Sequence, residues 1–534
     1  MSLDSEKQNK ARKNILKVYS DFVKKNKRNP THAELQGLGV SRNALRWHFG
    51  TYRDLKQEAR KLNPKAFEHI IDETLFNPFN FSVLEDEVAK YKKFIITTAV
   101  TGCEVHRGFY KAIKNYCKVN KALLLVIPVS DAAADAGWDL DKILKDEKLV
   151  FDNLELNSNI YISGIKMGAK QIDPTTGLGR MAQDSSFIYG SPKQRLKVVA
   201  NSNHKLPHVL MGTGAITKPN YLTETYSSKR TAVLAEFDHK IGAIVLELED
   251  EKYYFRQIQA EPNSGNFVDL ARYYTSSGKI SRLEPEAFIL GDWHSGETDP
   301  VAAKVWEEVI SETNPKDLIL HDLFNGSSIS HWTQNKVIKK ARMALSGDTN
   351  LTKELKTTSV DLLNLLDLIK GKIIITKSNH DDFLARYLED GRFMKDHENF
   401  KIAIEIVKEM VDDKDPVKFG VEMFLNEETK KRLKWLERDE DYRITKIECG
   451  THGDKGPNGS KGTLENHERS YKACTIGHSH TPGILREAYQ VGTTSRLDLD
   501  YAEGPSSWMH TSCLVYPNGS RQLINSIMGK WRLK

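Results

Sequence analysis

Five short clusters of Asp, His and Asn, lying between residues 291 and 480, constrain this 534-residue chain more than any other feature. Apolar runs at 287–290, 318–320 and 373–375 precede the first three, and helical patterns at 301–310 and 355–368 lie between them. In an open α/β sheet, ligands bind at the carboxyl ends of the strands. The spacing therefore predicts an α/β domain over residues 284–534 with one polar site at a sheet edge. In order, the clusters are Gly291-Asp292-Trp293-His294, His321-Asp322-Leu323-Phe324-Asn325-Gly326, Ser378-Asn379-His380-Asp381, Thr451-His452-Gly453-Asp454 and Gly477-His478-Ser479-His480.

Taken together, the clusters resemble the signature of the calcineurin-like metallophosphoesterases. That signature is D-x-H, G-D-x-x-D, G-N-H-[DE], a single His and G-H-x-H. The resemblance covers roughly residues 285–500, and residues 490–495 with a strand at 513–516 resemble the closing half-sheet of that family. It implies a sandwich of two mixed sheets flanked by helices.

The resemblance also implies a site for two divalent metal ions, with Asp322 bridging both. A pair of ions about 3.5 to 4 Å apart activates water and neutralises phosphoryl oxygens. Mixed imidazole and oxygen ligation favours Mn²⁺ as first choice, with Fe²⁺, Zn²⁺ and Mg²⁺ as alternatives. The implied ligands are Asp292, His294, His480 and Asp322 for one ion, and Asn379, His452, His478 and Asp322 for the other.

Two further roles concern residues beside the ligands. His380 corresponds to the family histidine that faces the substrate, where it stabilises the transition state or protonates the leaving oxygen. Asp381 or Asp382 is expected to orient it. The spacing of His478 and His480 is that of alternate residues on an extended strand, whose side chains point the same way.

The sequence departs from the family signature at three positions. Ser378 and His321 replace glycines, and Asn325 replaces the second Asp of G-D-x-x-D. Ser378 is compatible with the motif if its backbone avoids positive φ. His321 and His331 either enter the pocket or are ordinary surface or interior histidines.

The basic character of the chain is confined to its N-terminal part. Residues 1–66 contain 16 Lys and Arg against 6 Asp and Glu, a net charge of +10, whereas the remaining residues carry 62 against 66, a net charge of −4. Such an excess suits binding to a polyanion. A solvated, lysine-rich helix face is the alternative.

Residues 1–66 are predicted to be entirely helical, with a turn at Gly37 and Gly39 and a helix from the N-cap Ser41 to Phe49. The stretch 39–50 resembles the turn and recognition helix of tetracycline-repressor-like helix-turn-helix proteins. That resemblance implies DNA binding through Arg42, Asn43, Arg46 and His48. The alternative is that Leu45, Trp47 and Phe49 build a small core and the module binds protein.

The middle region, residues 67–283, is predicted to be an α/β domain of unassigned role. It begins with a strand at 94–100, a helix at 105–117 and a strand at 122–129. Further strands are predicted at 159–165, 231–237 and 241–248.

No segment has the roughly 20 apolar residues that a membrane span needs, and the N-terminus lacks the apolar stretch of a signal peptide. A cytoplasmic protein with no membrane contact is expected. The five cysteines contain no CxxC pair, so they are expected to be reduced and mostly buried.

The combination of a metallophosphoesterase region and a basic helix-turn-helix module resembles the pre-early nucleases with which T-five-like bacteriophages degrade host DNA. This resemblance implies a manganese-dependent DNase that hydrolyses phosphodiester bonds with metal-activated water. It also implies a homo-oligomer acting in the host bacterial cytoplasm. Two alternatives are a phosphoesterase for a non-DNA substrate, such as a cyclic nucleotide or a phosphoprotein, and a DNA-binding regulator with a degenerate esterase fold.

Overall fold

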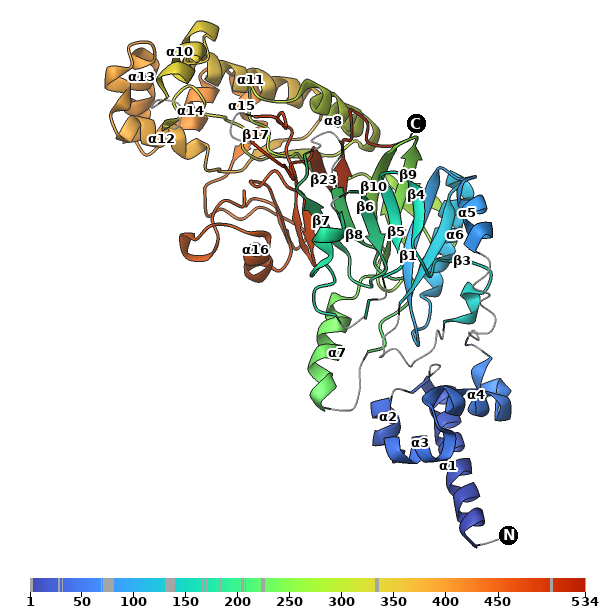
Figure 1. Cartoon of the computed structure of the whole chain (residues 1–534). Coiled ribbons are helices and arrows are strands. Elements are labelled where there is room, and N and C mark those ends of the chain that lie inside the picture. Colours follow the sequence, from blue (N-terminus) through green and yellow to red (C-terminus); the bar gives the residue numbers. More distant parts are fainter. Residues whose placement is uncertain are drawn as a thin grey trace. The chain divides into compact units, whose positions relative to one another are not determined.

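The computed structural model in Figure 1 divides into two compact units. The first comprises residues 1–195, 209–268 and 273–281, and the second comprises residues 196–208, 269–272 and 282–534. Among the described residues, no helix is both long and apolar enough to cross a bilayer. The structure describes all residues except 1–2, 27–28, 31, 69, 71–80, 130–139, 166, 169–170, 183, 203–205, 207, 222–225, 332–335, 500–502 and 534.

The first unit begins with helices and continues with two groups of strands. Its helices are α1 (Leu3–Asn26), α2 (His32–Gly37), α3 (Arg42–Phe49), α4 (Tyr52–Leu62), α5 (Phe81–Val88), α6 (Arg107–Asn120) and α7 (Tyr226–Asp238), with 3-10 turns η1 (Pro64–Phe67), η4 (Lys142–Leu144) and η5 (Leu178–Ala182). Its strands are β1 (Lys93–Val100), β2 (Leu123–Val129), β3 (Lys148–Leu149), β4 (Leu154–Asn157), β5 (Ile160–Ser163), β6 (Ser186–Tyr189), β8 (His208–Gly212), β9 (Gly242–Glu249) and β10 (Lys252–Gln259).

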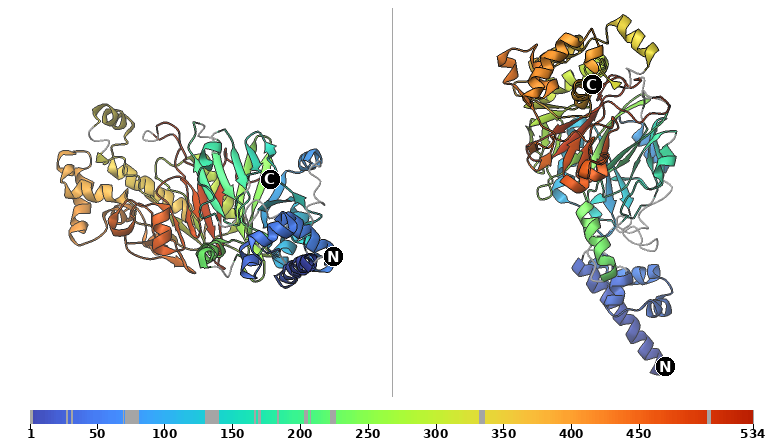
Figure 2. Two further views of the ribbon diagram at one scale, coloured as in Figure 1. Left: turned by 60° about the horizontal axis from the view of Figure 1, so that its bottom comes forward. Right: turned by 90° about the vertical axis from the view of Figure 1, so that its left-hand side faces the viewer.

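Helices α1 to α4, blue in Figures 1 and 2, pack around a core of their own, while the helix-turn-helix assignment stays a prediction. The Ser41 hydroxyl accepts from the backbone N–H of Ala44 at 3.1 Å, which confirms it as the N-cap of α3. Gly39 takes a φ of +88° in the turn between α2 and α3, a conformation that favours glycine. The Arg12 side chain of α1 donates to the carbonyl of His48 at 2.6 Å and pairs with Glu58 of α4, so it links three helices.

One part of the alternative reading of this module, the core of Leu45, Trp47 and Phe49, is wrong. Leu45 and Phe49 are buried in the core, but Trp47 is 75% exposed and takes no part in it. Leu45 and Phe49 are four residues apart and share a face of α3, whereas Trp47, two residues from each, points away from that face.

The middle region contains a mixed sheet of strand order β10-β9-β1-β2-β3, in which β1 and β2 are parallel. A second run of strands has the order β8-β6-β5-β4. These strands and α6 confirm the predicted elements at 94–129, 159–165 and 241–248. Three short strands, β11 (Phe267–Asp269), β12 (Arg272–Tyr274) and β13 (Ile280–Arg282), form a further sheet.

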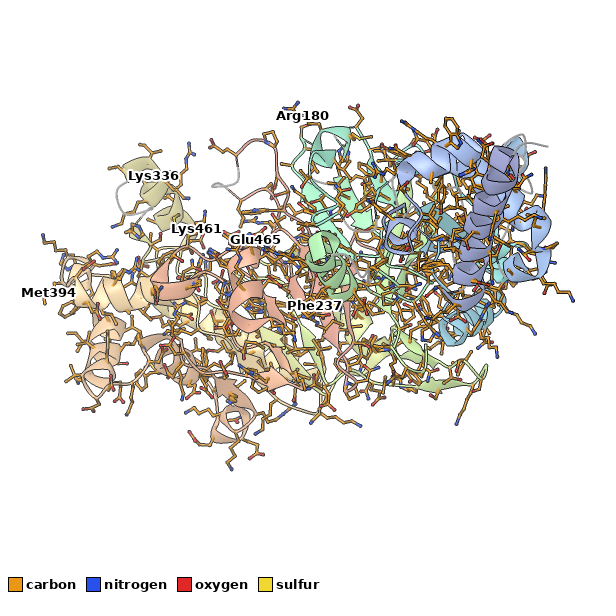
Figure 3. The ribbon with its side chains drawn as sticks, turned by 90° about the horizontal axis from the view of Figure 1, so that it is seen from below. Arg180, Phe237, Lys336, Met394, Lys461 and Glu465 are labelled. Atoms are coloured by element: carbon orange, nitrogen blue, oxygen red, sulfur yellow. The ribbon has the colours of Figure 1, made fainter. Side chains whose placement is uncertain are left out.

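The strand predicted at 231–237 is wrong, because these residues belong to helix α7. Ala232 and Ala235 are three residues apart, as a helix face requires, and both pack into a small core with Val100. The apolar residues between and after them point outward, so the alternation in the sequence did not reflect burial. Phe237, labelled in Figure 3, is 59% exposed.

The second unit is built from two sheets and a group of helices. Its helices are α8 (Pro300–Thr313), α10 (Val337–Ser346), α11 (Leu351–Asp367), α12 (Asp381–Glu389), α13 (Phe400–Val411), α14 (Pro416–Glu422), α15 (Glu427–Lys430) and α16 (Leu464–Tyr471), with 3-10 turns η6 (Arg392–Lys395) and η7 (Pro457–Gly459). Its strands are β7 (Arg195–Val199), β14 (Ala287–Ile289), β15 (Asp317–Leu320), β16 (Ile373–Ile375), β17 (Leu433–Trp435), β18 (Arg443–Ile444), β19 (Ile447–Glu448), β20 (Cys474–Ile476), β21 (Gly483–Leu485), β22 (Ala488–Gln490), β23 (Thr511–Val515) and β24 (Arg521–Asn525).

The two sheets place several parallel strand ends together. One sheet has the order β17-β16-β15-β14-β23-β24, with β14 to β17 parallel. The strands β18-β19-β20-β22-β21-β7 form the other run, with β19, β20 and β22 parallel. A mixed α/β fold is thus confirmed, whereas the calcineurin-like sandwich stays a prediction. All five cysteines are free, and only Cys117 is not fully buried.

The packing of α3 yields a test of the module's core. Leu45→Ala is expected to lower the free energy of unfolding of residues 42–62 by about 2 to 5 kcal/mol, because it opens a cavity. Trp47→Ala is the matched control, with an expected change within about 0.5 kcal/mol, because its side chain is exposed. Native-state hydrogen exchange of the α3 and α4 amides measures both values. Equal effects of the two substitutions would contradict this packing.

Candidate metal centre

The loops that follow β14 and β15 run beside each other and carry three of the predicted ligands. The backbone N–H of His294 donates to the carbonyl of Asp322 at 2.8 Å, and that of Trp293 donates to the carbonyl of His321 at 2.9 Å. These bonds extend the parallel pairing beyond the strands. On the other side, Asp292 exchanges backbone bonds with the segment 492–494 at 3.1 and 2.8 Å.

The second group of predicted ligands follows β16, β19 and β20. Asn379 comes after β16, His452 after β19, and His478 and His480 after β20. The backbone N–H of His478 donates to Oδ1 of Asp292 at 3.1 Å, which connects the loops of the two sheets.

Six of the seven predicted ligands form two groups that share Asp322. Asp292, His294, Asp322 and His480 form one group, and Asp322, His452 and His478 form the other. In each group, the candidate ligand atoms lie within 4.8 Å of one another, so each could hold a metal ion. Asn379 precedes His380, whose ring centroid is 4.6 Å from that of His294.

Short distances join these side chains across the two sheets. Nε2 of His294 lies 3.0 Å from Nε2 of His480. Nε2 of His480 lies 3.2 Å from Oδ2 of Asp292, and Nε2 of His452 lies 3.2 Å from Oδ2 of Asp322. Imidazole nitrogen and carboxylate oxygen atoms therefore converge in both groups.

Four of these residues have left-handed backbone conformations. The φ angles are +49° for His294, +45° for Asp322, +74° for His478 and +59° for His480. Such strain in non-glycine residues persists only where the surroundings impose it, and it is typical of functional sites. The expectation that His478 and His480 alternate on an extended strand is therefore wrong, because both lie in a loop after β20 has ended.

The electrostatics of the site follow from burial of two carboxylates. Burial alone would raise the pKa of Asp322, but the neighbouring histidines outweigh it and hold this pKa well below its usual value. Burial likewise opposes a proton on His452, yet the charges of Asp322 and Asp292 raise its pKa to about 9. In contrast, burial and the nearby His380 lower the pKa of His294 to about 3. His294 is thus neutral at physiological pH, the state in which imidazole binds metals.

Polar atoms that lack hydrogen-bond partners show that the groups fit a cation. Oδ1 of Asp322, Oδ1 of Asn379 and Nδ1 of His478 are buried, and none has a hydrogen-bond partner. An unsatisfied buried polar atom costs about 1 to 3 kcal/mol, so such atoms call for a ligand. The mixed set of imidazole, carboxylate and amide donors suits a divalent transition metal.

His380 lies at this site, but its partner differs from the expected one. Its Nδ1 is 2.7 Å from the backbone carbonyl of Asn325, so Nδ1 carries the proton of that hydrogen bond. Asp381 instead accepts from the backbone N–H of Ser378 at 2.8 Å, and burial raises its pKa to about 7. Asp382 pairs with Arg438 at 3.3 Å. The orienting group of His380 is therefore a main-chain carbonyl.

Two of the three departures from the family signature, Ser378 and His321, have distinct outcomes. Ser378 does not have positive φ, so its side chain is compatible with the loop. His321 is fully buried, with Nδ1 at 3.1 Å from the Thr376 hydroxyl and its ring 5.5 Å from that of His452. Neither metal group includes it. His331 packs its ring against Phe383 instead.

Outside the predicted clusters, three side chains hold the site loops. Arg438 donates to both oxygens of Asp454 at 2.7 Å and to the carbonyl of Ser378 at 2.8 Å, so it ties two clusters together. Glu354 and Asp361 of α11 bind two other loops. Glu354 and Asp361 lie within a helix, and Arg438 follows β17 but belongs to none of the predicted clusters, so no motif in the sequence marks them.

The four predicted DNA contacts lie on α3, away from this centre in the sequence. Arg42, Asn43 and Arg46 are exposed. His48 is partly buried, and its ring contacts that of Phe49. α3 therefore presents three of the four side chains to solvent.

Comparison with known proteins finds one informative similarity. The chain is 27% identical to Protein A1 of Escherichia phage T5 over 478 residues, which cover 83% of this chain and 84% of that protein. No protein-family model matches the chain, and no solved structure matches it. The similarity supports the predicted relation to T-five-like phage proteins, while membership of the metallophosphoesterases stays a prediction.

The close packing of Asp292 and His321 against Gly477 provides a test of the site geometry. A Cβ at this position would lie 2.3 Å from Oδ1 of Asp292 and 2.9 Å from Cγ of His321. Gly477→Ala is therefore expected to displace Asp292 and weaken Mn²⁺ binding at least about tenfold, as measured by the Mn²⁺-dependent rise in melting temperature. Gly179→Ala, where no atom lies within 4 Å, is the control. An unchanged Mn²⁺ response in Gly477→Ala would contradict the geometry.

Proposed function

We propose that the chain is a metal-dependent deoxyribonuclease of the calcineurin-like metallophosphoesterase type, which hydrolyses DNA phosphodiester bonds. The observation that carries the proposal is the pair of buried Asp and His groups with Asp322 as their common member. A shared carboxylate between two adjacent groups is the arrangement that a two-metal hydrolase requires. Asn379 supplies an amide oxygen without a hydrogen-bond partner to the second group.

Two divalent ions, with Mn²⁺ as first choice, would supply a water-derived nucleophile at neutral pH and neutralise the phosphoryl oxygens. Asp292, His294 and His480 would hold one ion, Asn379, His452 and His478 the other, and Asp322 would contact both. The chain's own contribution is to fix these side chains in one geometry. Burial excludes competing water from the carboxylates, because Asp292 and Asp322 are 0% and 1% exposed.

His380 is the residue proposed to act on the substrate. Its Nδ1 donates to the carbonyl of Asn325, so the ring is held in one orientation and Nε2 is directed elsewhere. His380 is partly exposed, unlike the fully buried His294. A proton on Nε2 would stabilise the phosphoryl oxygens or be transferred to the leaving oxygen.

The N-terminal module supports DNA as the substrate. Residues 1–66 carry a net charge of +10, and α3 exposes Arg42, Asn43 and Arg46. A helix-turn-helix module places such side chains against the major groove and the phosphates. In this proposal, the module collects DNA and the metal centre cleaves it. The similarity to a phage protein supports a role in an infected bacterium. We propose host DNA as the target and a homo-oligomer as the active form.

Metal-dependent cleavage of DNA is the direct test of this function. The intact protein is expected to cleave plasmid DNA with Mn²⁺ and to lose this activity with EDTA. Asp322→Ala is expected to lower kcat at least about 1000-fold, because one side chain serves both ions. Asp367→Ala, which removes an exposed carboxylate of α11, is the matched control and is expected to retain activity.

Gel analysis of circular and linear DNA, beside a chromogenic phosphodiester, separates the outcomes. Cleavage of the small ester without cleavage of DNA would overturn the nuclease proposal and retain a phosphoesterase. Full activity of Asp322→Ala would overturn the assignment of the bridging ligand.

The module's role is tested by a charge-matched pair of variants. Arg42→Ala with Arg46→Ala is expected to weaken DNA binding and to lower the slope of log affinity against log salt by up to about two, because each lost phosphate contact removes about 0.9. Lys111→Ala with Lys118→Ala, at exposed positions of α6, is the control with the same charge change. Fluorescence anisotropy over a range of salt concentrations measures both. An unchanged slope in the first variant would show that α3 does not contact DNA phosphates.

A further inference from the structure

Helix α11 contains two carboxylates that contact the site although neither is a predicted ligand. Glu354 and Asp361 are seven residues apart, which is about two helical turns, so they lie on the same face of α11. Figure 1 shows α11 among the yellow and orange helices of the second unit. Both side chains are partly buried.

Asp361 holds the loop that carries the first pair of ligands. Its Oδ2 accepts the indole N–H of Trp293 at 2.9 Å. Trp293 lies between Asp292 and His294 in the sequence and is 5% exposed. Because the backbone of this loop also pairs with the Asp322 loop, fixing the indole fixes the two ligands on either side of it.

Glu354 holds the loop that follows Asp322. Its Oε1 accepts the backbone N–H of Ser327 at 2.7 Å and the hydroxyl of Ser327 at 3.1 Å. Its Oε2 accepts the backbone N–H of Ser328 at 3.1 Å and the hydroxyl of Ser328 at 2.5 Å. All four bonds end on one carboxylate, and a carboxylate is the side chain that accepts at both oxygens.

The Glu354 loop reaches the proposed catalytic histidine. Asn325 lies two residues before Ser327, and its carbonyl accepts the Nδ1 proton of His380 at 2.7 Å. A shift of the loop would therefore move the group that orients His380. The bond that Asp361 accepts comes from Trp293 in the preceding loop, so the two carboxylates hold different loops of the site.

We infer that Glu354 and Asp361 are positioning residues that align two loops of the metal centre from one face of α11, Asp361 for the metal ligands and Glu354 for His380. This inference rests on the proposed function. Residues that orient metal ligands typically change metal affinity or activity by about 10- to 100-fold when they are removed. The two carboxylates are expected to differ in which of these quantities they change.

The experiment compares Asp361→Ala, Glu354→Gln and the control Asp367→Ala in the full-length protein. Asp361→Ala is expected to weaken Mn²⁺ binding about 10- to 100-fold, measured without DNA from the electron paramagnetic resonance signal of free Mn²⁺. Glu354→Gln places an amide nitrogen opposite an N–H donor, and it is expected to lower kcat for DNA about 10- to 100-fold at saturating Mn²⁺. Its KM and its Mn²⁺ affinity are expected to stay within about threefold of wild type.

Milder variants keep the inference testable if either substitution prevents folding. Trp293→Phe removes the indole N–H and part of the ring system but keeps an aromatic side chain, and it should reproduce the direction of Asp361→Ala. Ser328→Ala removes one of the four bonds to Glu354 and should lower kcat with unchanged Mn²⁺ affinity. If wild-type protein shows no Mn²⁺-dependent DNase activity, the proposed function itself is wrong. If wild-type protein is active, two results would overturn the positioning inference but leave the proposed function standing. In the first, the Asp361 and Glu354 variants behave like Asp367→Ala. In the second, each variant changes kcat and Mn²⁺ affinity together.

Discussion

Burial of two carboxylates beside each other is the constraint on which the second unit depends. Asp292 and Asp322 are 0% and 1% exposed, and a buried charge is costly unless it is paired. In this protein the nearest partners are imidazoles, which hold the pKa of Asp322 well below its usual value. In turn, the charges of Asp322 and Asp292 raise the pKa of His452 to about 9. The site therefore draws positive charge to Asp322, and a divalent cation would provide it most effectively.

The rest of the fold brings these groups together and keeps them in place. Parallel strands of two sheets end at the same site, and backbone bonds between the loops continue the pairing past the strands. The loops adopt left-handed conformations at His294, Asp322, His478 and His480, which cost free energy that the surrounding structure must offset. The side chains of Arg438, Glu354 and Asp361 supply part of this support from outside the motifs. Ligands, loop conformation and supporting helix thus form one connected unit.

Much of this arrangement was predictable because strand ends and polar clusters coincide in the sequence. Apolar runs marked β14, β15 and β16, and parallel pairing forces the residues that follow them to one edge. The resemblance to the metallophosphoesterase signature added which residues of the second sheet were expected to meet them around Asp322. The sequence could not predict how they meet, because the loop conformation of His478 and His480 and the main-chain partner of His380 depend on contacts with distant segments. The sequence also could not predict that one face of α11 binds the loops, because nothing in the sequence distinguishes Glu354 and Asp361 from other carboxylates on helices. The alternating pattern at 231–237 led to a wrong strand prediction, because Ala232 and Ala235 pack on one face of a helix.

The proposed nuclease requires two metal ions that share Asp322. A crystal of the protein grown with Mn²⁺ and measured with X-rays at the manganese absorption edge tests it most directly, because anomalous scattering locates manganese independently of any assumed ligand. If two ions share this carboxylate, two anomalous peaks should lie on either side of Asp322, about 3.5 to 4 Å apart. One peak should lie against Asp292, His294 and His480, and the other against Asn379, His452 and His478. A crystal that shows no manganese at Asp322, or manganese bound by other residues, would contradict it.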